Sequence, residues 1–255
     1  MLLALDIGNT QMKLGAFEGS DLKARWHVAT DIDRLADEYA VLINNLLAMG
    51  GIDRARIDAG VYATVVPPLA PVFGEMFARH FGVKALRVGA GVRTGLRIEY
   101  ESRELGPDRI AVALGALQLH RPPLIVVSLG TGTVFEAISA DSAYLGGAFA
   151  PGISVATEAL AGKAAMLSSV ELSPPKKAIG TNTTAAMQSG VVYGYAELIE
   201  GMVRRFKTEV GEDAWVIGTG GWAPMMSQLT RCFDQVDENV SLYGLRQVYE
   251  MNEGS

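Results

Sequence analysis

The sequence predicts an α/β fold built from two similar lobes, and two observations carry this prediction. Short apolar segments typical of strands alternate with segments of helical periodicity along the 255 residues. An apolar run that ends in a glycine turn also occurs twice, as LLALDIGNT at 2–10 and as LIVVSLGTGT at 124–133. Asp6 and Ser128, at matching positions of these runs, lie 122 residues apart, close to half the chain. We therefore expect each lobe to open with a strand, a glycine turn and a second strand.

The remaining elements follow from apolar periodicity and from glycine and proline positions. Helices are expected over 31–49, 68–81, 108–120, 154–166 and 183–209, and from Ala223 onward. Further strands are expected over 60–63 and 215–217, and the second strands of the two lobes over 12–18 and 134–139. The repeat predicts a first lobe over 1–117 and a second over 118–255.

Composition and charge exclude several classes of protein. Hydrophobic residues make up 49% of the chain, which supports a globular core and excludes a largely disordered protein. The net charge of −6 does not suit phosphate-backbone binding, so no nucleic-acid partner is expected. No apolar run approaches the roughly 20 residues of a membrane span, and the opening MLLALDIGNT lacks the features of a secretory signal. Because Cys232 is the sole cysteine, no internal disulfide forms, and we expect a cytoplasmic protein without a membrane partner.

Three glycine-rich turns that follow apolar strands are candidate phosphate-binding loops. Glycine lets the backbone approach an anion closely, and successive N–H groups can then point at it. The first loop comprises Asp6, Ile7, Gly8, Asn9, Thr10, Gln11, Met12 and Lys13, the second Gly130, Thr131, Gly132 and Thr133, and the third Gly218, Gly220 and Gly221 around Thr219. Threonine hydroxyls can donate to phosphate, Lys13 can reach the same anion, and Asp6 can hold Mg²⁺. The alternative is three tight strand-end turns without a ligand, but three such turns in one chain favour phosphate binding.

Other phosphate and catalytic signatures are absent from the sequence. There is no P-loop and no Gly-x-Gly-x-x-Gly motif, so we expect two glycine turns to hold the phosphates across a cleft. The histidines, His27, His80 and His120, show no metal-ligand spacing, and no Gly-x-Ser-x-Gly elbow occurs. The sequence therefore favours phosphate chemistry over zinc or serine chemistry.

An acid and a guanidinium stand side by side in Gly106-Pro107-Asp108-Arg109, at an expected helix start. One interpretation is structural, because the helix dipole favours a carboxylate in the first turn and Arg109 is then a surface charge. The other is functional: Asp108 is a general base that orients a substrate hydroxyl, and Arg109 binds a substrate carboxylate through both oxygens. The residues alone leave both interpretations open.

The chain resembles the type III pantothenate kinases, which catalyse the first step of coenzyme A synthesis in many bacteria. The resemblance rests on DIGNT at 6–10, TVVP at 64–67, TGL at 94–96, GPDR at 106–109 and GTGT at 130–133. It continues with YLGGA at 144–148, APGI at 150–153, MQSG at 187–190, GTGG at 218–221, VD at 236–237 and GLR at 244–246. Each motif is short, but their order and spacing extend over nearly the whole chain.

The resemblance implies an actin-like, ribonuclease H-like fold of two duplicated lobes with an ATP cleft between them. It also implies phosphorylation of pantothenate by ATP with Mg²⁺ and a monovalent cation, K⁺ or NH₄⁺, in a homodimer that completes the pantothenate pocket. By matching position, Asp6 would hold Mg²⁺, Asp108 would be the catalytic base and Thr131 would contact ATP. The matching substrate-side positions are Tyr100, Gly106, Pro107, Asp108, Arg109 and Thr183, and Gly218 to Gly221 match the adenosine end of the nucleotide.

The chain departs from the family pattern at several positions. Ser128 stands where the family usually has the Asp that binds the monovalent cation, so that charge is missing, and Glu136 is the next carboxylate along the chain. The other departures are a stretch between Tyr100 and Asp108 that is one residue short, Lys163 for Arg, Ala164 for Thr and Tyr243 for Glu. Lysine keeps the charge of arginine but not its bidentate fork.

Three functions are compatible with these patterns. The first is an ATP-dependent kinase that phosphorylates pantothenate to 4′-phosphopantothenate. The second is a non-catalytic relative that binds a nucleotide or pantothenate as a regulatory accessory protein, motivated by the departures at Ser128, Lys163 and Ala164. The third is a kinase of the same fold that acts on another small hydroxylated acid or sugar. Retention of Asp6, Asp108 and Arg109 favours the first.

Overall fold

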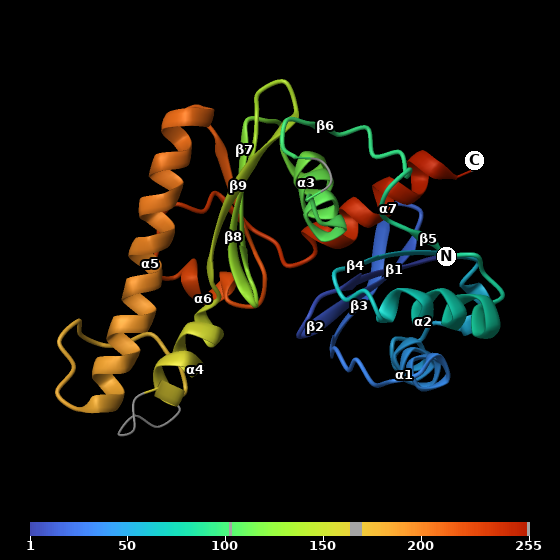
Figure 1. The fold of residues 1–255 in the computed structure, drawn as a ribbon, viewed down its shortest axis with the longest axis horizontal. Helices are drawn as coiled ribbons and strands as arrows, with labels where there is room; N and C mark the ends of the chain where they lie inside the picture. Colours follow the sequence, from blue (N-terminus) through green and yellow to red (C-terminus); the bar gives the residue numbers. More distant parts are fainter. Residues whose placement is uncertain (102–103, 164–169, 254–255) are drawn as a thin grey trace. The chain divides into compact units, whose positions relative to one another are not determined.

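The computed structural model describes residues 1–101, 104–163 and 170–253, apart from the side chain of Lys163 (Figure 1). The chain forms two compact units. The first consists of Met1–Leu96, Glu101–Gln118 and Val240–Ser255, and the second of Arg97–Tyr100 and Leu119–Asn239.

The first unit is built on a five-stranded mixed sheet. Its strands, in spatial order, are β3 (Asp21–Ala29), β2 (Gln11–Glu18), β1 (Leu2–Ile7), β4 (Ala59–Thr64) and β5 (Leu86–Arg87). β1 is antiparallel to β2 and parallel to β4. The helices of this unit are α1 (Ala36–Met49), α2 (Leu69–Met76) with a following π-helical turn (Phe77–Phe81), α3 (Pro107–Leu119) and α7 (Val240–Asn252), beside a 3₁₀ turn (Arg54–Arg56).

Strand β1 is buried on both of its faces. Leu3, Leu5 and Ile7 pack in a core with side chains of α1 and α2. The alternate residues Leu2 and Ala4 pack in a second core with side chains of α3 and α7. Because successive side chains of a strand point to opposite faces, helices on both sides require the continuous apolar run seen in the sequence.

Helices α3 and α7 approach each other through glycines. A Cβ atom added to Gly115 of α3 would overlap the carbonyl oxygen of Val240, and one added to Gly244 of α7 would overlap the carbonyl oxygen of Ala111. The two backbones are therefore too close for any side chain at these positions. This contact makes the C-terminal helix a part of the first unit.

The second unit repeats the strand order of the first. Its sheet contains β11 (Gln235–Val236), β10 (Trp215–Thr219), β7 (Leu124–Leu129), β8 (Gly132–Ile138), β9 (Ala143–Pro151) and, at one edge, β6 (Arg97–Ile98). β7 is antiparallel to β8 and parallel to β10, as β1 is to β2 and β4. The helices are α4 (Ile153–Lys163), α5 (Thr183–Val210) and α6 (Ala223–Met226), and residues of α5 pack on β7.

The predicted α/β class and the repeated strand–turn–strand opening are confirmed. The expected division into 1–117 and 118–255 differs from the two units at the C-terminus, because Leu242, Leu245 and Val248 of α7 pack in a core of the first unit. Helix α1 begins at Ala36 rather than at 31, and α6 ends after four residues. The expected helix over 154–166 is described only to Lys163.

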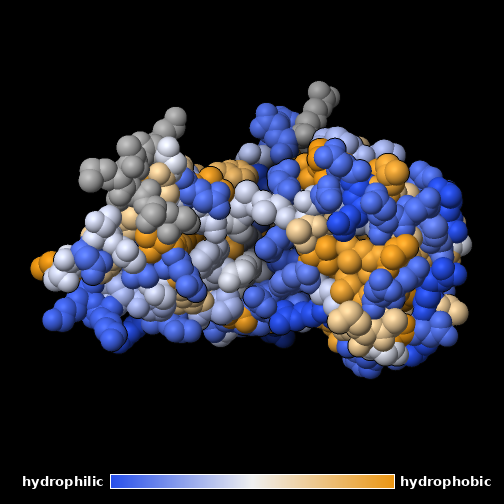
Figure 2. Space-filling view, turned by 90° about the horizontal axis from the view of Figure 1, so that it is seen from below, coloured by the Kyte–Doolittle hydropathy of each residue, from blue (hydrophilic) through white to orange (hydrophobic). Residues whose placement is uncertain are grey.

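The surface of the protein is mainly polar on the face that Figure 2 shows, as expected for a chain with a globular composition. In the described part of the chain no helix combines the length and apolarity needed to cross a bilayer. Figure 2 shows a mostly hydrophilic surface with apolar areas between the polar ones. The exposed large apolar residues of the first unit are Ile32, Leu35, Val41 and Met49.

The glycine contact between α3 and α7 predicts a position-specific effect of alanine. Gly244→Ala is expected to lower the free energy of unfolding by about 1–3 kcal/mol or more, because the helices must move apart. The matched control is Gly201→Ala on α5, where an added Cβ would lie 3.9 Å from an arginine nitrogen and no closer to anything else. The control is expected to leave stability unchanged or to raise it by up to about 1 kcal/mol. Urea denaturation checks both, and equal effects of the two variants would contradict the close approach.

Candidate active site

The first candidate phosphate loop is the turn between β1 and β2. Asp6 lies next to the end of β1 and pairs in register with Lys13 of β2, so the carboxylate and the ammonium project from the same face of the hairpin. The amide of Gly8 donates to the carbonyl oxygen of Gln11 at 3.1 Å. A Cβ on Gly8 would lie 2.8 Å from the same oxygen, so this turn requires glycine.

Burial divides the eight residues of this loop into two groups. The side chains of Ile7 and Met12 are fully buried in the core, so these two positions offer only backbone atoms to a ligand. The side chains that remain accessible are those of Asp6, Asn9, Thr10, Gln11 and Lys13. Thr30, the residue after β3, fixes the turn because its hydroxyl donates to the carbonyl oxygen of Gly8 at 2.7 Å.

Asp108 lies in the first turn of α3 and is held close to Asp6. Burial raises the pKa of the Asp108 carboxyl, and the negative charge of Asp6 raises it further. The backbone amides of Arg109 and of Asp108 itself, and the charge of Arg109, oppose these effects. Asp6 and Asp108, which are 102 residues apart in the sequence, therefore belong to one site in the first unit.

The absence of a side chain at Gly106 leaves room for the Asp108 carboxylate. A Cβ added to Gly106 would press on Oδ1 of Asp108, and it would lie 3.9 Å from a methyl group of Val65. Val65 follows β4, and its amide donates to the carbonyl oxygen of Ile7 at 3.2 Å. The ends of β1 and β4 and the start of α3 thus meet at this carboxylate.

Such a carboxylate is suited to proton transfer. An aspartate with a raised pKa holds a proton more firmly than an ordinary one and is a stronger base when ionised. Arg109 beside it is buried, with 7% of its surface exposed. The interpretation of Arg109 as a plain surface charge is therefore wrong.

The second and third glycine turns adjoin each other in the second unit. The amide of Gly130 donates to the carbonyl oxygen of Gly132 at 3.0 Å, which closes a turn one residue shorter than the one between β1 and β2. Gly220, in the third turn, has a φ of +90°, and an added Cβ would lie 2.5 Å from the carbonyl oxygen of Leu129 at the end of β7. Gly218 and Gly221 flank this contact, Gly218 buried and Gly221 exposed.

Three hydroxyls near these turns are buried without a hydrogen-bond partner among the described residues. They belong to Ser128, Thr133 and Thr219. Ser128 and Thr219 are register partners on β7 and β10, so their side chains lie on the same face of the sheet. Thr219 stands inside the third glycine turn, between two of the candidate phosphate-binding glycines. Thr131, by contrast, is exposed at the tip of the second turn.

The residues around position 128 offer few ligands to the monovalent cation that the resemblance implies. Ser128 supplies a neutral oxygen, and within residues 1–101, 104–163 and 170–253 no group of three or more His, Cys, Asp or Glu side chains could hold a metal ion. Glu136 is buried, and it accepts a hydrogen bond from the Tyr144 hydroxyl at 2.9 Å. These residues do not fit a cation held by a carboxylate at position 128.

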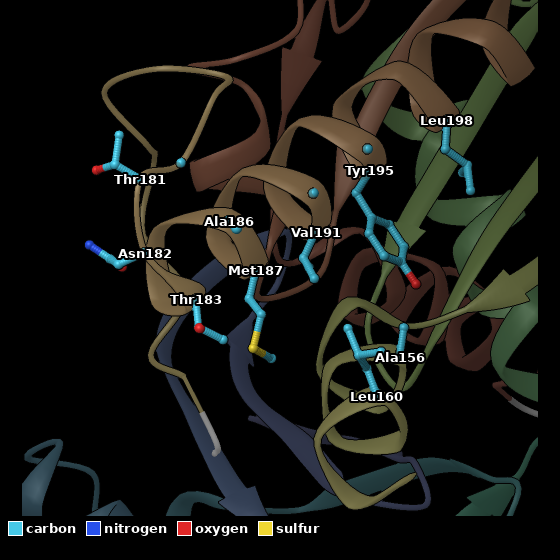
Figure 3. A pocket seen from close by; sticks show the side chains of 13 residues that line it. Ala156, Leu160, Thr181, Asn182, Thr183, Ala186, Met187, Val191, Tyr195 and Leu198 are labelled. Carbon is cyan, nitrogen blue, oxygen red and sulfur yellow. The ribbon is translucent and has the colours of Figure 1, made fainter. Parts of the chain in front are cut away.

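The two remaining substrate-side candidates lie in the second unit. Tyr100 is half-buried, with its ring centroid 6.2 Å from that of Tyr144. Thr183 is exposed at the first position of α5 and lines an apolar groove of 840 Å³ between α4 and α5 (Figure 3). Figure 3 shows Met187 and Val191 of α5 facing the groove, with Leu160 of α4 on the other side. The departure at Ala164 lies outside the described residues, as does the side chain of Lys163.

Solved structures share this fold at low sequence identity. A conserved Campylobacter jejuni protein assigned to the Baf family of transcriptional activators is 17% identical, with a TM-score of 0.64 over 99% of this chain and all of that one. The ethanolamine utilization protein EutJ of Carboxydothermus hydrogenoformans is 16% identical, with a TM-score of 0.58 over 96% of this chain and 89% of its own. These likenesses concern the fold alone, and they agree with the predicted α/β architecture.

Sequence comparison is more specific. The model of the type III pantothenate kinase family matches residues 2–205. The type III pantothenate kinase of Roseiflexus castenholzii is 47% identical over 253 residues, 99% of each chain. The enzyme of the same name from Moorella thermoacetica is 46% identical over 99% of this chain and all of its own. The chain therefore belongs to the type III pantothenate kinase family.

Proposed function

We propose that this kinase transfers the γ-phosphoryl group of ATP to the primary hydroxyl of pantothenate, forming 4′-phosphopantothenate and ADP in the first step of coenzyme A synthesis. Membership of the family supports the reaction and the substrate. The observation that supports the catalytic role of Asp108 is its half-buried position beside Asp6, where desolvation and the charge of Asp6 both raise its pKa. An aspartate that only stabilised the start of a helix would be more stable in water, away from a second carboxylate.

Asp108 is the base in the proposed mechanism. Its carboxylate accepts a hydrogen bond from the pantothenate hydroxyl and orients the oxygen for in-line attack on the γ-phosphorus. The new O–P bond forms as the bond between the γ-phosphorus and the bridging oxygen of ADP breaks. The hydroxyl proton passes to Asp108, and ADP leaves with the bonding electron pair.

The nucleotide is held by the glycine turns. We assign the triphosphate to the amides of the first and second loops, together with the side chains of Lys13 and Thr131, and the adenosine end to Gly218, Gly220 and Gly221. Asp6 fits Mg²⁺, because its carboxylate is accessible at the strand end that bears Lys13. Bound Mg²⁺ would neutralise phosphate charge and so favour attack by the hydroxyl.

Pantothenate is assigned, by position in the family pattern, to Tyr100, Gly106, Pro107, Asp108, Arg109 and Thr183. The guanidinium of Arg109 matches the substrate carboxylate in charge and in its planar fork. The neutral hydroxyl of Ser128 supports turnover that depends little on K⁺ or NH₄⁺.

We also assign the protein to the cytoplasm as a homodimer. The single cysteine fits a reducing compartment. The groove between α4 and α5 exposes apolar side chains next to Thr183, which supports a second subunit at this place.

Release of ADP in a coupled assay with MgATP and pantothenate tests the proposed reaction. Wild-type protein is expected to turn over only with pantothenate, at similar rates in K⁺ and Na⁺. Asp108→Asn is expected to lower kcat by roughly 10²–10⁴-fold, and Gly106→Ala to lower it as well, because the added Cβ displaces the carboxylate. Gly89→Ala, where an added Cβ meets nothing within 4 Å, is the matched control. Binding of both ligands without ADP release would support the accessory role instead.

The raised pKa of Asp108 predicts that the same substitution stabilises the fold. The folded protein holds the Asp108 proton more tightly than the unfolded chain, so this contribution to stability is present at low pH and is lost as the pH rises through the raised pKa. At pH 8 the ionised carboxylate therefore costs stability. Asp108→Asn is expected to raise Tm at pH 8 and to raise it less at pH 4. A Tm difference independent of pH would argue against the burial of this charge.

The dimer assignment predicts a particle mass of twice the 27.1 kDa of the chain in sedimentation equilibrium. Gly190 lines the groove, and an added Cβ there meets nothing within 4 Å, so Gly190→Arg leaves the unit folded. The charged side chain would obstruct the proposed interface, and this variant is expected to sediment as a monomer. If Gly190→Arg dimerised with an unchanged dissociation constant, the interface would lie elsewhere on the protein.

A further inference from the structure

The segment Arg97–Tyr100 is bound to the second unit as an edge strand. Arg97 and Ile98 pair in parallel with Ala143 and Tyr144 of β9. The amide of Glu99 donates to the carbonyl oxygen of Tyr144 at 2.8 Å. Outside the ladder, Arg97 forms an ion pair with Asp141 at 2.6 Å. The backbone on the N-terminal side of Tyr100 is therefore fixed to β9.

The side chain of Tyr100 is held between two residues of β9. Its ring meets the ring of Tyr144 edge to face, at 88° between the planes. The Tyr100 ring also packs against Gly146, where an added Cβ would lie 3.2 Å from Cδ2 of Tyr100. Gly146 has a φ of +131°, a backbone conformation that favours glycine. Any larger residue at 146 would push against this ring.

The two residues of β9 that contact Tyr100 lie on either side of a bulge. Tyr144 pairs with Ile138 of β8, and Gly146 pairs with the adjacent Ala137, so Leu145 is the extra residue of a bulge. In a regular strand residues i and i+2 share one face, and here the extra residue bends the strand between the two contacts. A bulge typically re-aims side chains beside a functional site.

Tyr144 is fixed in turn by a buried carboxylate. Its side chain is fully buried, and its hydroxyl donates to Oε1 of Glu136 at 2.9 Å. Glu136 has 1% of its surface exposed. A hydrogen bond in the dry interior is stronger than one in water, and leaving either partner unpaired there is costly, so this bond defines the orientation of the Tyr144 ring.

We propose that Tyr144, with Glu136 and Gly146, forms a positioning support that sets the Tyr100 side chain for binding of the pantoyl part of the substrate. The inference rests on the proposed function for the identity of the substrate, but the support itself is a property of the second unit. Tyr144 and Glu136 act through Tyr100 and touch no reacting atom.

Kinetics of Tyr144→Phe test the proposal. The variant keeps the ring and loses the hydroxyl, and we expect KM for pantothenate to rise about three- to tenfold, with kcat and KM for MgATP nearly unchanged. In a Tyr100→Ala background the same substitution is expected to have no further effect on KM for pantothenate. Equal effects of Tyr144→Phe with and without Tyr100, or an equal rise in both KM values, would overturn the proposal.

Two control variants separate positioning from loss of stability. Tyr62→Phe removes another buried hydroxyl, which donates to the carbonyl oxygen of Ala70 at 3.0 Å in the first unit. Gly211→Ala matches Gly146→Ala in backbone cost, because Gly211 has a φ of +134°. Both controls are expected to lower Tm and to leave KM for pantothenate unchanged, whereas Gly146→Ala raises it. If the control variants also raised KM for pantothenate, the effect of Gly146→Ala would come from lost stability and the positioning role would be rejected.

A spectroscopic readout keeps this test independent of turnover. Protein labelled with 3-fluorotyrosine should give eight ¹⁹F resonances, one for each tyrosine, and Tyr100→Phe assigns that of Tyr100 by its loss. Tyr144→Phe and Gly146→Ala are expected to shift or broaden the Tyr100 resonance, and Tyr62→Phe is expected to leave it unchanged. An unmoved resonance overturns the support even if pantothenate is the substrate. A moved resonance in a protein that phosphorylates another acid retains the support and rejects the substrate.

Discussion

The proximity of two carboxylates is the constraint on which the first unit depends. Asp108 is half-buried beside Asp6, and both its desolvation and the like charge disfavour its ionised form. Backbone amides at the start of α3 offset part of this cost, and glycine at 106 leaves room for the carboxylate. The position of α3 follows from its glycine contact with α7, so the helix α7 supports a carboxylate 132 residues before its first residue. Stability is given up locally for a base suited to proton transfer.

The two units share one strand topology but carry different side chains at the matching strand end. Both open with a hairpin whose first strand ends in a glycine turn, and both place a parallel strand on the other side. In the first unit this strand end carries Asp6, and in the second the matching position carries Ser128, with Thr219 beside it. A charged group suits a divalent cation, whereas neutral hydroxyls suit contacts with phosphate or nucleotide oxygens. The duplicated fold thus gives two similar frames, and the residues at the strand ends decide what each can bind.

The edge strand β6 departs from the order of the two units along the chain. Arg97–Tyr100 lies between segments of the first unit in sequence but belongs to the sheet of the second. A ladder fixes its backbone, and a bulge, a glycine and a tyrosine–glutamate hydrogen bond fix its last side chain. The placement of the Tyr100 side chain therefore depends on residues that lie up to 46 positions further along the chain.

The sequence by itself determined the α/β class, the duplicated opening, the glycine turns and the placement of Asp108 at a helix start. These features depend on local periodicity and on conformations that only glycine adopts readily, and both are visible in short segments. Its motifs also identified the family. Only the tertiary structure decided that α7 packs in the first unit, that Arg109 is buried and that Asp6 raises the pKa of Asp108. The physical reason is that burial and charge proximity depend on which distant segments meet, and no local pattern records this.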